Sequence, residues 1–332
     1  MTDSSRPLTF EAVRRLQLHR NPTEHTAPAS LPQPPFPNIP TRRLTKKDLM
    51  GRDVRAVAAG HIPSGAELIY EPSRSEYMPR RTIKAKDKEL RPLNIYPPDR
   101  RYTFYSTDYP WRTLGRVSGR LAGAGVLVGP RHLLTASHLV QWNGDNTAGA
   151  VQFAPMYHGG TLPFGTANAQ LTYSYRKVGD NANDADVAED YVVCVLDQRL
   201  GDRLGWMGAK TYTEDWDDGT YWAHVGYSAD LGGGQLPSFQ NQISFEDADH
   251  PGPIGFIIDI DSGDGLDIET ETASVTHGDS GGPFFGWWDG ESYPSVVAVM
   301  SAEGYLEQDN DNWAGGGSPM VHLILQARAE YP

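Results

Sequence analysis

Gly278-Asp279-Ser280-Gly281-Gly282-Pro283 is the most informative stretch of this 332-residue sequence. Glycines on both sides of Ser280 allow a tight turn that exposes the serine hydroxyl. In such a turn the N–H groups of Gly278 and Ser280 can point to one place, where they would stabilise a developing oxyanion. A serine hydroxyl is a weak nucleophile and needs a neighbouring base. The stretch therefore predicts a catalytic serine with a base supplied from elsewhere in the chain.

A histidine suited to this role follows a predicted strand far upstream. Residues 129–138 read GPRHLLTASH, in which the β-run ends at Thr135 and Ala136 and presents His138 on the next turn. We expect His138 to act as the general base and acid. His132 lies inside the predicted strand, and we interpret it as a bystander.

The third group required is a buried carboxylate that orients the histidine and stabilises its charged form. Asp190 is the last acidic residue before an apolar run, which makes it the carboxylate most easily carried into the interior. Asp184, Asp186 and Glu189 are nearby alternatives. We favour Asp190.

The order His138, Asp190, Ser280 along the chain separates two fold classes. An α/β-hydrolase places its acid and its histidine after the serine. Only 52 residues follow Ser280, and their single histidine, His322, falls in a predicted C-terminal helix over residues 319–331. Short apolar runs instead alternate with glycine, aspartate and asparagine turns, which is typical of antiparallel strands in an all-β fold. These runs are residues 123–129, 171–179, 190–197, 220–227, 255–261 and 294–301.

Charge is distributed unevenly along the sequence. The net charge is -13, yet residues 1–101 hold 19 Lys and Arg against 11 Asp and Glu, and residues 102–332 hold 10 against 31. An acidic body is a poor nucleic-acid binder. No apolar run approaches the roughly 20 residues that span a bilayer. The sequence thus predicts neither a nucleic-acid nor a membrane partner. The basic segment is either a solvated tail or a segment that docks on the acidic body.

The single cysteine, Cys194, excludes an intramolecular disulfide and any multi-cysteine metal site. It lies in the apolar run after Asp190, where we expect a buried small hydrophobic residue. We expect no metal and no cofactor.

The first part of the chain has little core pattern of its own. Its opening residues lack the apolar region of a secretory signal. Phe10, Val13 and Leu16 recur at three-residue spacing, which predicts a short amphipathic helix. Residues 21–40 are proline-rich and read as a linker or a strapped-down arm. Residues 41–93 are basic and mixed.

These motifs together resemble the trypsin-like serine endopeptidases of the chymotrypsin fold. The string TASH at residues 135–138 is similar to the family's Thr-Ala-x-His, and residues 278–283 match its Gly-Asp-Ser-Gly-Gly-Pro. The likeness is closest to the glutamyl-endopeptidase branch and covers roughly residues 95–328. It is carried by IYPPDRR at 95–101 with YPWR at 109–112, and by Asp190-Tyr191 with the stretch 200–208.

The resemblance implies an all-β fold of two six-stranded antiparallel β-barrels, with a boundary near residue 210 and the active site between the barrels. It assigns His138, Asp190 and Ser280 to a catalytic triad and the N–H groups of Gly278 and Ser280 to an oxyanion hole. The substrate-binding positions that it implies are Ser274, Val275, Met300, Ser301, Ala302 and Glu303.

Each of these positions carries a specific expectation. Ser301 would lie near the Asp190 carboxylate, and residues 302–304 would pair with the substrate backbone as an added strand. Met300 stands where the glutamyl branch has a carboxylate-binding histidine, and Val275 replaces a hydroxyl residue. Ser274, at the pocket floor, carries no charge. We therefore expect an uncharged residue on the substrate at P1.

Family members are usually made as zymogens and are mostly secreted. The resemblance implies residues 1–94 as a basic N-terminal extension or pro-region and residues 95–332 as the protease domain. A freed amino group near Asn94 or Ile95 could approach Asp279. We expect a monomer that acts on polypeptides. A catalytically silent binding module and an esterase without protease activity are the alternatives.

Overall fold

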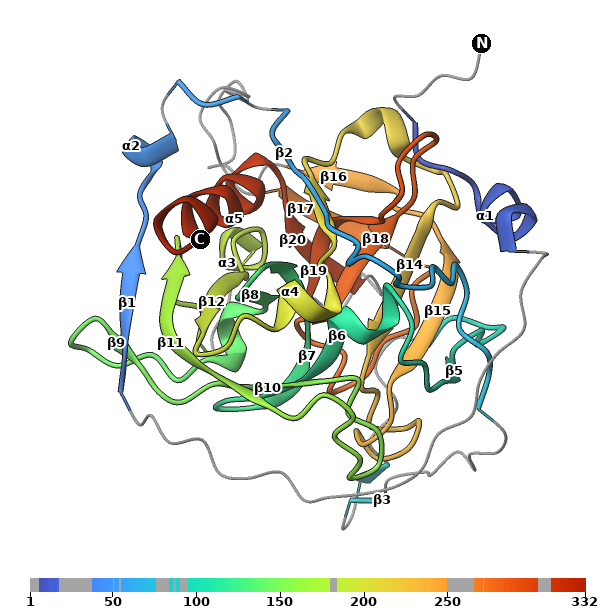
Figure 1. Ribbon diagram of the computed structural model, residues 1–332, viewed down its shortest axis with the longest axis horizontal. Helices are drawn as coiled ribbons and strands as arrows, with labels where there is room; N and C mark the ends of the chain where they lie inside the picture. Colours follow the sequence, from blue (N-terminus) through green and yellow to red (C-terminus); the bar gives the residue numbers. More distant parts are fainter. Residues whose placement is uncertain are drawn as a thin grey trace.

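The computed structural model describes residues 6–17, 38–49, 51–53, 55–75, 84–85, 88–89, 95–179, 184–249, 266–270, 272–303 and 312–332. Two β-sheet units lie side by side, and the C-terminal helix α5 (Ser318–Glu330) lies beside the first of them (Figure 1). This helix confirms the one predicted from residues 319–331. No helix in the described ranges is long and apolar enough to cross a membrane.

The first unit is a closed six-stranded antiparallel barrel. Its strands follow the order β10, β6, β7, β8, β12, β11, and β11 pairs back with β10. Val192 at the start of β12 lies opposite Thr135 at the end of β8. The segment that precedes β12 and the segment that follows β8 therefore emerge at one edge of the barrel. The strands are β6 (Leu114–Ser118), β7 (Ala122–Gly129), β8 (His132–Thr135), β10 (Gln152–Pro155), β11 (Ala167–Ser174) and β12 (Val192–Leu196).

The second unit is a larger sheet built around β19 (Ser295–Glu303). This strand pairs with β18, β20 and, in parallel, β13. Side-chain hydrogen bonds, such as Gln240 Nε2 to the carbonyl of Thr272 at 2.6 Å, link β15 to the segment after β17. The strands are β5 (Tyr102–Thr103), β13 (Gly208–Lys210), β14 (Trp222–Gly226), β15 (Ser238–Ile243), β16 (Asp247–Asp249), β17 (Leu266–Thr270), β18 (Pro283–Gly286) and β20 (Asn312–Gly316).

The all-β prediction is confirmed, since a closed barrel and a second sheet account for most of the fold. Five of the six apolar runs contain strands, and the sixth, residues 255–261, lies outside the described residues. The remaining elements are short: α2 (Lys46–Leu49), α3 (Asp184–Val187), α4 (Leu200–Leu204), β3 (Lys84–Ala85), β4 (Lys88–Glu89), β9 (Thr147–Ala148) and 3-10 turns at Trp111–Thr113, Ser137–Leu139 and Glu214–Trp216.

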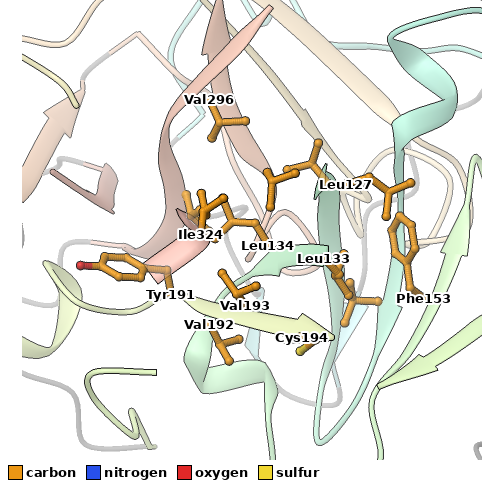
Figure 2. Close-up of a cluster of buried hydrophobic side chains, with 14 of the residues drawn as sticks. Leu127, Leu133, Leu134, Phe153, Tyr191, Val192, Val193, Cys194, Val296 and Ile324 are labelled. Carbon is orange, nitrogen blue, oxygen red and sulfur yellow. The ribbon is translucent and has the colours of Figure 1, made fainter. Parts of the chain in front are cut away.

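The main core lies inside the first barrel and under α5. Figure 2 shows side chains of β7, β8, β10 and β12 gathered with Val296 of β19 and Ile324 of α5. All five residues of β12 are buried, because the strand lies in the wall of the closed barrel between β8 and β11 and contacts α5. Its apolar run is therefore continuous rather than alternating. Cys194 is free and buried within it, and burial raises the pKa of its thiol to about 12.

The N-terminal segment supplies strands to both units. β1 (Ile39–Arg43) pairs in parallel with β11, and β2 (Val57–Ala58) pairs with β13. Ile39 and Ala58 are buried in the main core. Helix α1 (Phe10–Gln17) confirms the predicted amphipathic helix. These strands were not evident in the sequence because short strands need little apolar pattern of their own when the body supplies the core.

Replacing Ala58 with aspartate is expected to lower the free energy of unfolding by about 3 kcal/mol or more, because an unpaired carboxylate would be buried. Ala58 is 0% exposed, whereas its neighbour Val57 is 53% exposed. Val57→Asp is therefore the matched control, with an expected change of about 0.5 kcal/mol or less. Chemical denaturation measures both. Equal stability of the two variants would contradict the packing of β2 against the body.

Candidate active site

His138 and Asp190 meet at the edge of the first barrel. The ring atom His138 Nδ1 lies 2.6 Å from Asp190 Oδ2, and the backbone N–H of His138 donates to Asp190 Oδ1 at 2.8 Å. The Asp190 carboxylate is 1% exposed. His138 lies on the 3-10 turn Ser137–Leu139, which follows β8, as the sequence predicted. A buried carboxylate that holds Nδ1 fixes the ring tautomer and orientation.

Asp190 has a third donor from the second unit. The hydroxyl of Ser301, on β19, donates to Asp190 Oδ2 at 2.7 Å. The two units therefore meet at this carboxylate. Of the alternative acids, Asp186 and Glu189 pair with Arg176 at 3.1 and 3.6 Å, and the side chain of Asp184 lies outside the described residues.

The loop that carries Ser280 is pressed against the same edge. The N–H of Ala124 on β7 donates to the carbonyl of Ser280 at 2.8 Å. At Gly281, a Cβ atom would lie 2.3 Å from Thr135 Oγ1 and 2.9 Å from the nitrogen of Ala136. Only glycine permits this approach. Thr135 and Ala136 come just before the turn of His138, so the serine is brought to the edge at which the histidine stands.

Two backbone amides in this loop have no hydrogen-bond acceptor among the described residues. Gly278 has a φ of +96°, and a Cβ there would lie 2.2 Å from the carbonyl oxygen of Tyr227. The amides of Asp279 and Gly281 donate to Thr276 and Met300. Within the described residues, the alternating amides of Gly278 and Ser280 donate to no other group. They therefore remain available to a substrate oxygen.

The positions assigned to the specificity pocket lie beside this loop. The N–H of Met300 donates to the carbonyl of Gly282 at 2.9 Å, and Met300 and Val275 both belong to the apolar core of the second unit. Ser274 is 1% exposed, and its Oγ accepts from the N–H of Tyr96 at 3.1 Å. The three side chains present no charge.

Two histidines of the sequence analysis lie elsewhere. His132 begins β8, at the end of the strand opposite to His138, and burial lowers the pKa of its ring to about 4. His322 lies on α5 with Nε2 2.7 Å from the carbonyl of Asp53.

Among solved structures, a Glu endopeptidase determined in complex with MPD shares the fold, with a TM-score of 0.53 and 16% identity over 70% of this chain and 99% of its own. The protease Anisep from Arthrobacter nicotinovorans has a TM-score of 0.49 and 19% identity over 68% of this chain and 98% of its own. The thermostable serine protease AL20 from an extremophilic microorganism has a TM-score of 0.48 and 18% identity over 66% and 98%. The first of these likenesses shows the chymotrypsin-like fold.

One curated protein matches by sequence. It is named extracellular metalloprotease, from Bacillus subtilis (strain 168), and is 26% identical over 147 residues, which cover 42% of this chain. The chain spans 46% of that protein's length. No family model matches the chain.

Proposed function

We propose that this chain is a serine endopeptidase that hydrolyses peptide bonds through an acyl-enzyme. The observation that carries the proposal is the 2.6 Å contact between His138 Nδ1 and the buried Asp190 carboxylate, at the edge where the Ser280 loop is seated. Three elements far apart in the sequence converge there. A carboxylate, a histidine and a serine between glycines are the parts of an activated nucleophile.

The reaction would begin with attack of Ser280 Oγ on the scissile carbonyl carbon. Because Asp190 holds Nδ1 of His138, Nε2 is the ring nitrogen that takes the serine proton. The oxyanion would accept hydrogen bonds from the amides of Gly278 and Ser280. His138 would then protonate the leaving amine as the C–N bond breaks. Water, deprotonated by the same histidine, would attack the ester carbonyl, and the histidine would return that proton to Ser280 Oγ as the acyl C–O bond breaks.

The substrate backbone would bind along the last residues of β19. Strand β18 pairs with β19 as far as Val299, and β20 covers the other edge through Ala302 and Glu303. Residues 301–303 therefore offer one edge beyond the end of β18. We propose that an extended substrate pairs there as an added strand.

We further propose that the P1 residue of the substrate is uncharged. Val275 and Met300 belong to the apolar core beside the Ser280 loop, and the Ser274 hydroxyl already bonds with the backbone of Tyr96. A buried carboxylate or ammonium without a partner is strongly disfavoured. None of the side chains of Ser274, Val275 and Met300 carries a charge that could pair with either group.

Processing near Asn94 and Ile95 stays a prediction, and Asn94 lies outside the described residues. Residues 39–43 and 57–58 are strands of the two sheets. We propose that a chain cut near Ile95 would retain this segment as a second, non-covalently held chain. The full-length protein is therefore the right material for activity measurements.

The proposal is tested with full-length protein on casein and on peptides that differ only at P1. We expect cleavage that stops after treatment with a fluorophosphonate and continues in the presence of a chelator. We expect kcat/KM at least about 10-fold higher for leucine or phenylalanine at P1 than for glutamate, lysine or arginine. Cleavage of activated esters alone would identify an esterase instead.

The opposite inhibition pattern would contradict the proposal. The sequence relative is called a metalloprotease, so loss of activity with the chelator and not with the fluorophosphonate would favour metal-dependent chemistry. The described residues contain no group of three or more His, Cys, Asp or Glu placed to hold a metal ion.

A further inference from the structure

A buried cluster of charges lies beneath the loop of Ser280. Arg101 is at its centre, with a side chain only 2% exposed. Its guanidinium donates to both oxygens of Asp99, at 3.1 Å each, and to both oxygens of Asp230, at 3.0 and 2.6 Å. Burial alone would lower the pKa of Arg101, but the bonds to Asp99 and Asp230 raise it above its usual range. The cation is thus permanent and fixed in two directions.

The cluster connects directly to the catalytic loop. Thr276 Oγ1 donates to Asp230 Oδ1 at 2.9 Å, and the N–H of Thr276 donates to Asp279 Oδ2 at 2.8 Å. Arg101 Nη1 lies 4.0 Å from the same Asp279 oxygen. Asp279 stands between Gly278 and Ser280, the two residues whose amides face the substrate. Any movement of its carboxylate would therefore move the oxyanion hole.

The Asp279 carboxylate is enclosed on all sides. It is 1% exposed and accepts from Ser228 Oγ at 2.8 and 2.9 Å. A Cβ at Gly226 would lie 2.0 Å from Asp279 Oδ1, so only glycine at that position leaves room for it. Burial raises the pKa of Asp279 to about 7, and Arg101 opposes that rise.

The charged groups around Asp279 consist of one cation and two further carboxylates. Asp230 raises the pKa of Asp279, whereas Arg101 lowers it. His224, on the neighbouring strand β14, is kept neutral because burial lowers its pKa to about 3. Arg101 is therefore the cation among the described residues that favours the ionised form of Asp279, alongside the hydrogen bonds donated by Thr276 and Ser228.

We propose that Arg101 is a positioning residue, an internal cation that holds Asp279 and with it the amides of Gly278 and Ser280 in the uncut chain. The inference rests on the proposed function. It means that the oxyanion hole is formed without an amino terminus released by cleavage near Ile95. A cut there, if one is made, would act on another part of the molecule.

The guanidinium is required for its shape as well as its charge. A planar fork can bind two carboxylates bidentately, whereas the ammonium of lysine is a point charge. Arg101→Lys should therefore preserve part of the effect on Asp279 and lose the link to Asp230. Arg100, the preceding residue, is exposed and bonds only to Gln242 among the described residues, at 3.1 Å. Arg100→Gln is the matched control for Arg101→Gln.

The test measures the rate of fluorophosphonate labelling of the full-length protein from pH 5 to 9, with intact mass recorded for each sample. We expect wild type to be labelled as the uncut 36.6 kDa chain. Arg101→Gln should be labelled about 100-fold more slowly near neutral pH, as for loss of an oxyanion donor. Arg101→Lys should fall between these, and Arg100→Gln within about twofold of wild type.

The pH profile separates positioning from a general loss of packing. Without Arg101, Asp279 ionises at a higher pH, so the acid limb of the labelling rate should move upward in Arg101→Gln. A packing defect would lower the rate equally at all pH values. Thermal melting shows whether Arg101→Gln is folded. If it is not, the labelling rates of Arg101→Lys and of the uncut wild type test the inference instead.

The remaining outcomes separate failure of this inference from failure of the proposed function. Labelling of Arg101→Gln at the wild-type rate, with an unmoved acid limb, would overturn the inference while leaving the proposed function in place. So would wild type that is labelled only after residues before Ile95 have been removed. Wild type that is labelled in neither form would instead overturn the proposed function, and this inference with it.

Discussion

Ser280→Ala is expected to lower kcat for peptide hydrolysis about 10⁶-fold without unfolding the protein. The hydroxyl is the only atom removed, and the contacts that seat the loop are made by the backbone: the carbonyl of Ser280 accepts from Ala124, and the N–H of Gly281 donates to Met300. The oxyanion hole and the histidine would therefore persist around a missing nucleophile. Steady-state hydrolysis of a chromogenic peptide, with the melting temperature as a check on folding, measures the effect.

Ser292→Ala provides the control, because Ser292 is exposed and lies outside the site. It should hydrolyse the peptide at about the wild-type rate. A Ser280→Ala protein that retains more than about one hundredth of the wild-type kcat would identify a different nucleophile. The assignment of Ser280 would then be wrong.

Asp190→Asn is expected to lower kcat about 10⁴-fold. Both oxygens of this carboxylate accept hydrogen bonds. The backbone N–H of His138 donates to Oδ1, and its ring Nδ1 and the Ser301 hydroxyl bond to Oδ2. An asparagine amide must direct its NH₂ group at one of these partners. Facing Nδ1, it would stabilise the tautomer that carries its proton on Nε2, which cannot accept the serine proton.

The effect should appear in chemistry rather than in binding. We expect kcat to fall while KM changes little, because Asp190 touches the histidine and not the substrate. Asp186→Asn is the matched control, since Asp186 pairs with Arg176. Equal activity of the two variants would contradict the role of Asp190.

The residues of the candidate site could be predicted from the sequence because local order determines them. Glycine is required where Gly278 adopts a positive φ and where Gly281 meets Thr135. The glycines of the motif therefore indicate the conformation of the loop. Asp190 was separable from its neighbours because the apolar strand that follows it is the part of the segment that enters the core. Of its alternatives, Asp184 and Asp186 lie in the short helix α3, and Asp186 and Glu189 pair with Arg176.

The charge cluster of Arg101 could not be predicted in the same way. Arg101 and Asp230 are 129 residues apart, and Thr276 joins them from a third segment. No spacing or periodicity relates residues that meet only in the tertiary structure. The N-terminal part is basic as a whole, but its total charge does not indicate that one of its arginines, Arg101, is buried in this cluster.

The strands contributed by the N-terminal segment were hidden for a different reason. β2 has two residues, and one of them is exposed. A strand this short gains its stability from β13 and from the core around Ala58 rather than from its own pattern. The tertiary context, and not propensity, forms such elements.

The central claim is that Ser280 is an activated nucleophile. The most direct test is the intact mass of the full-length protein after incubation with a fluorophosphonate, with Ser280→Ala treated in parallel. We expect one adduct on wild type and none on the variant. An adduct on both proteins, or on neither, would contradict it.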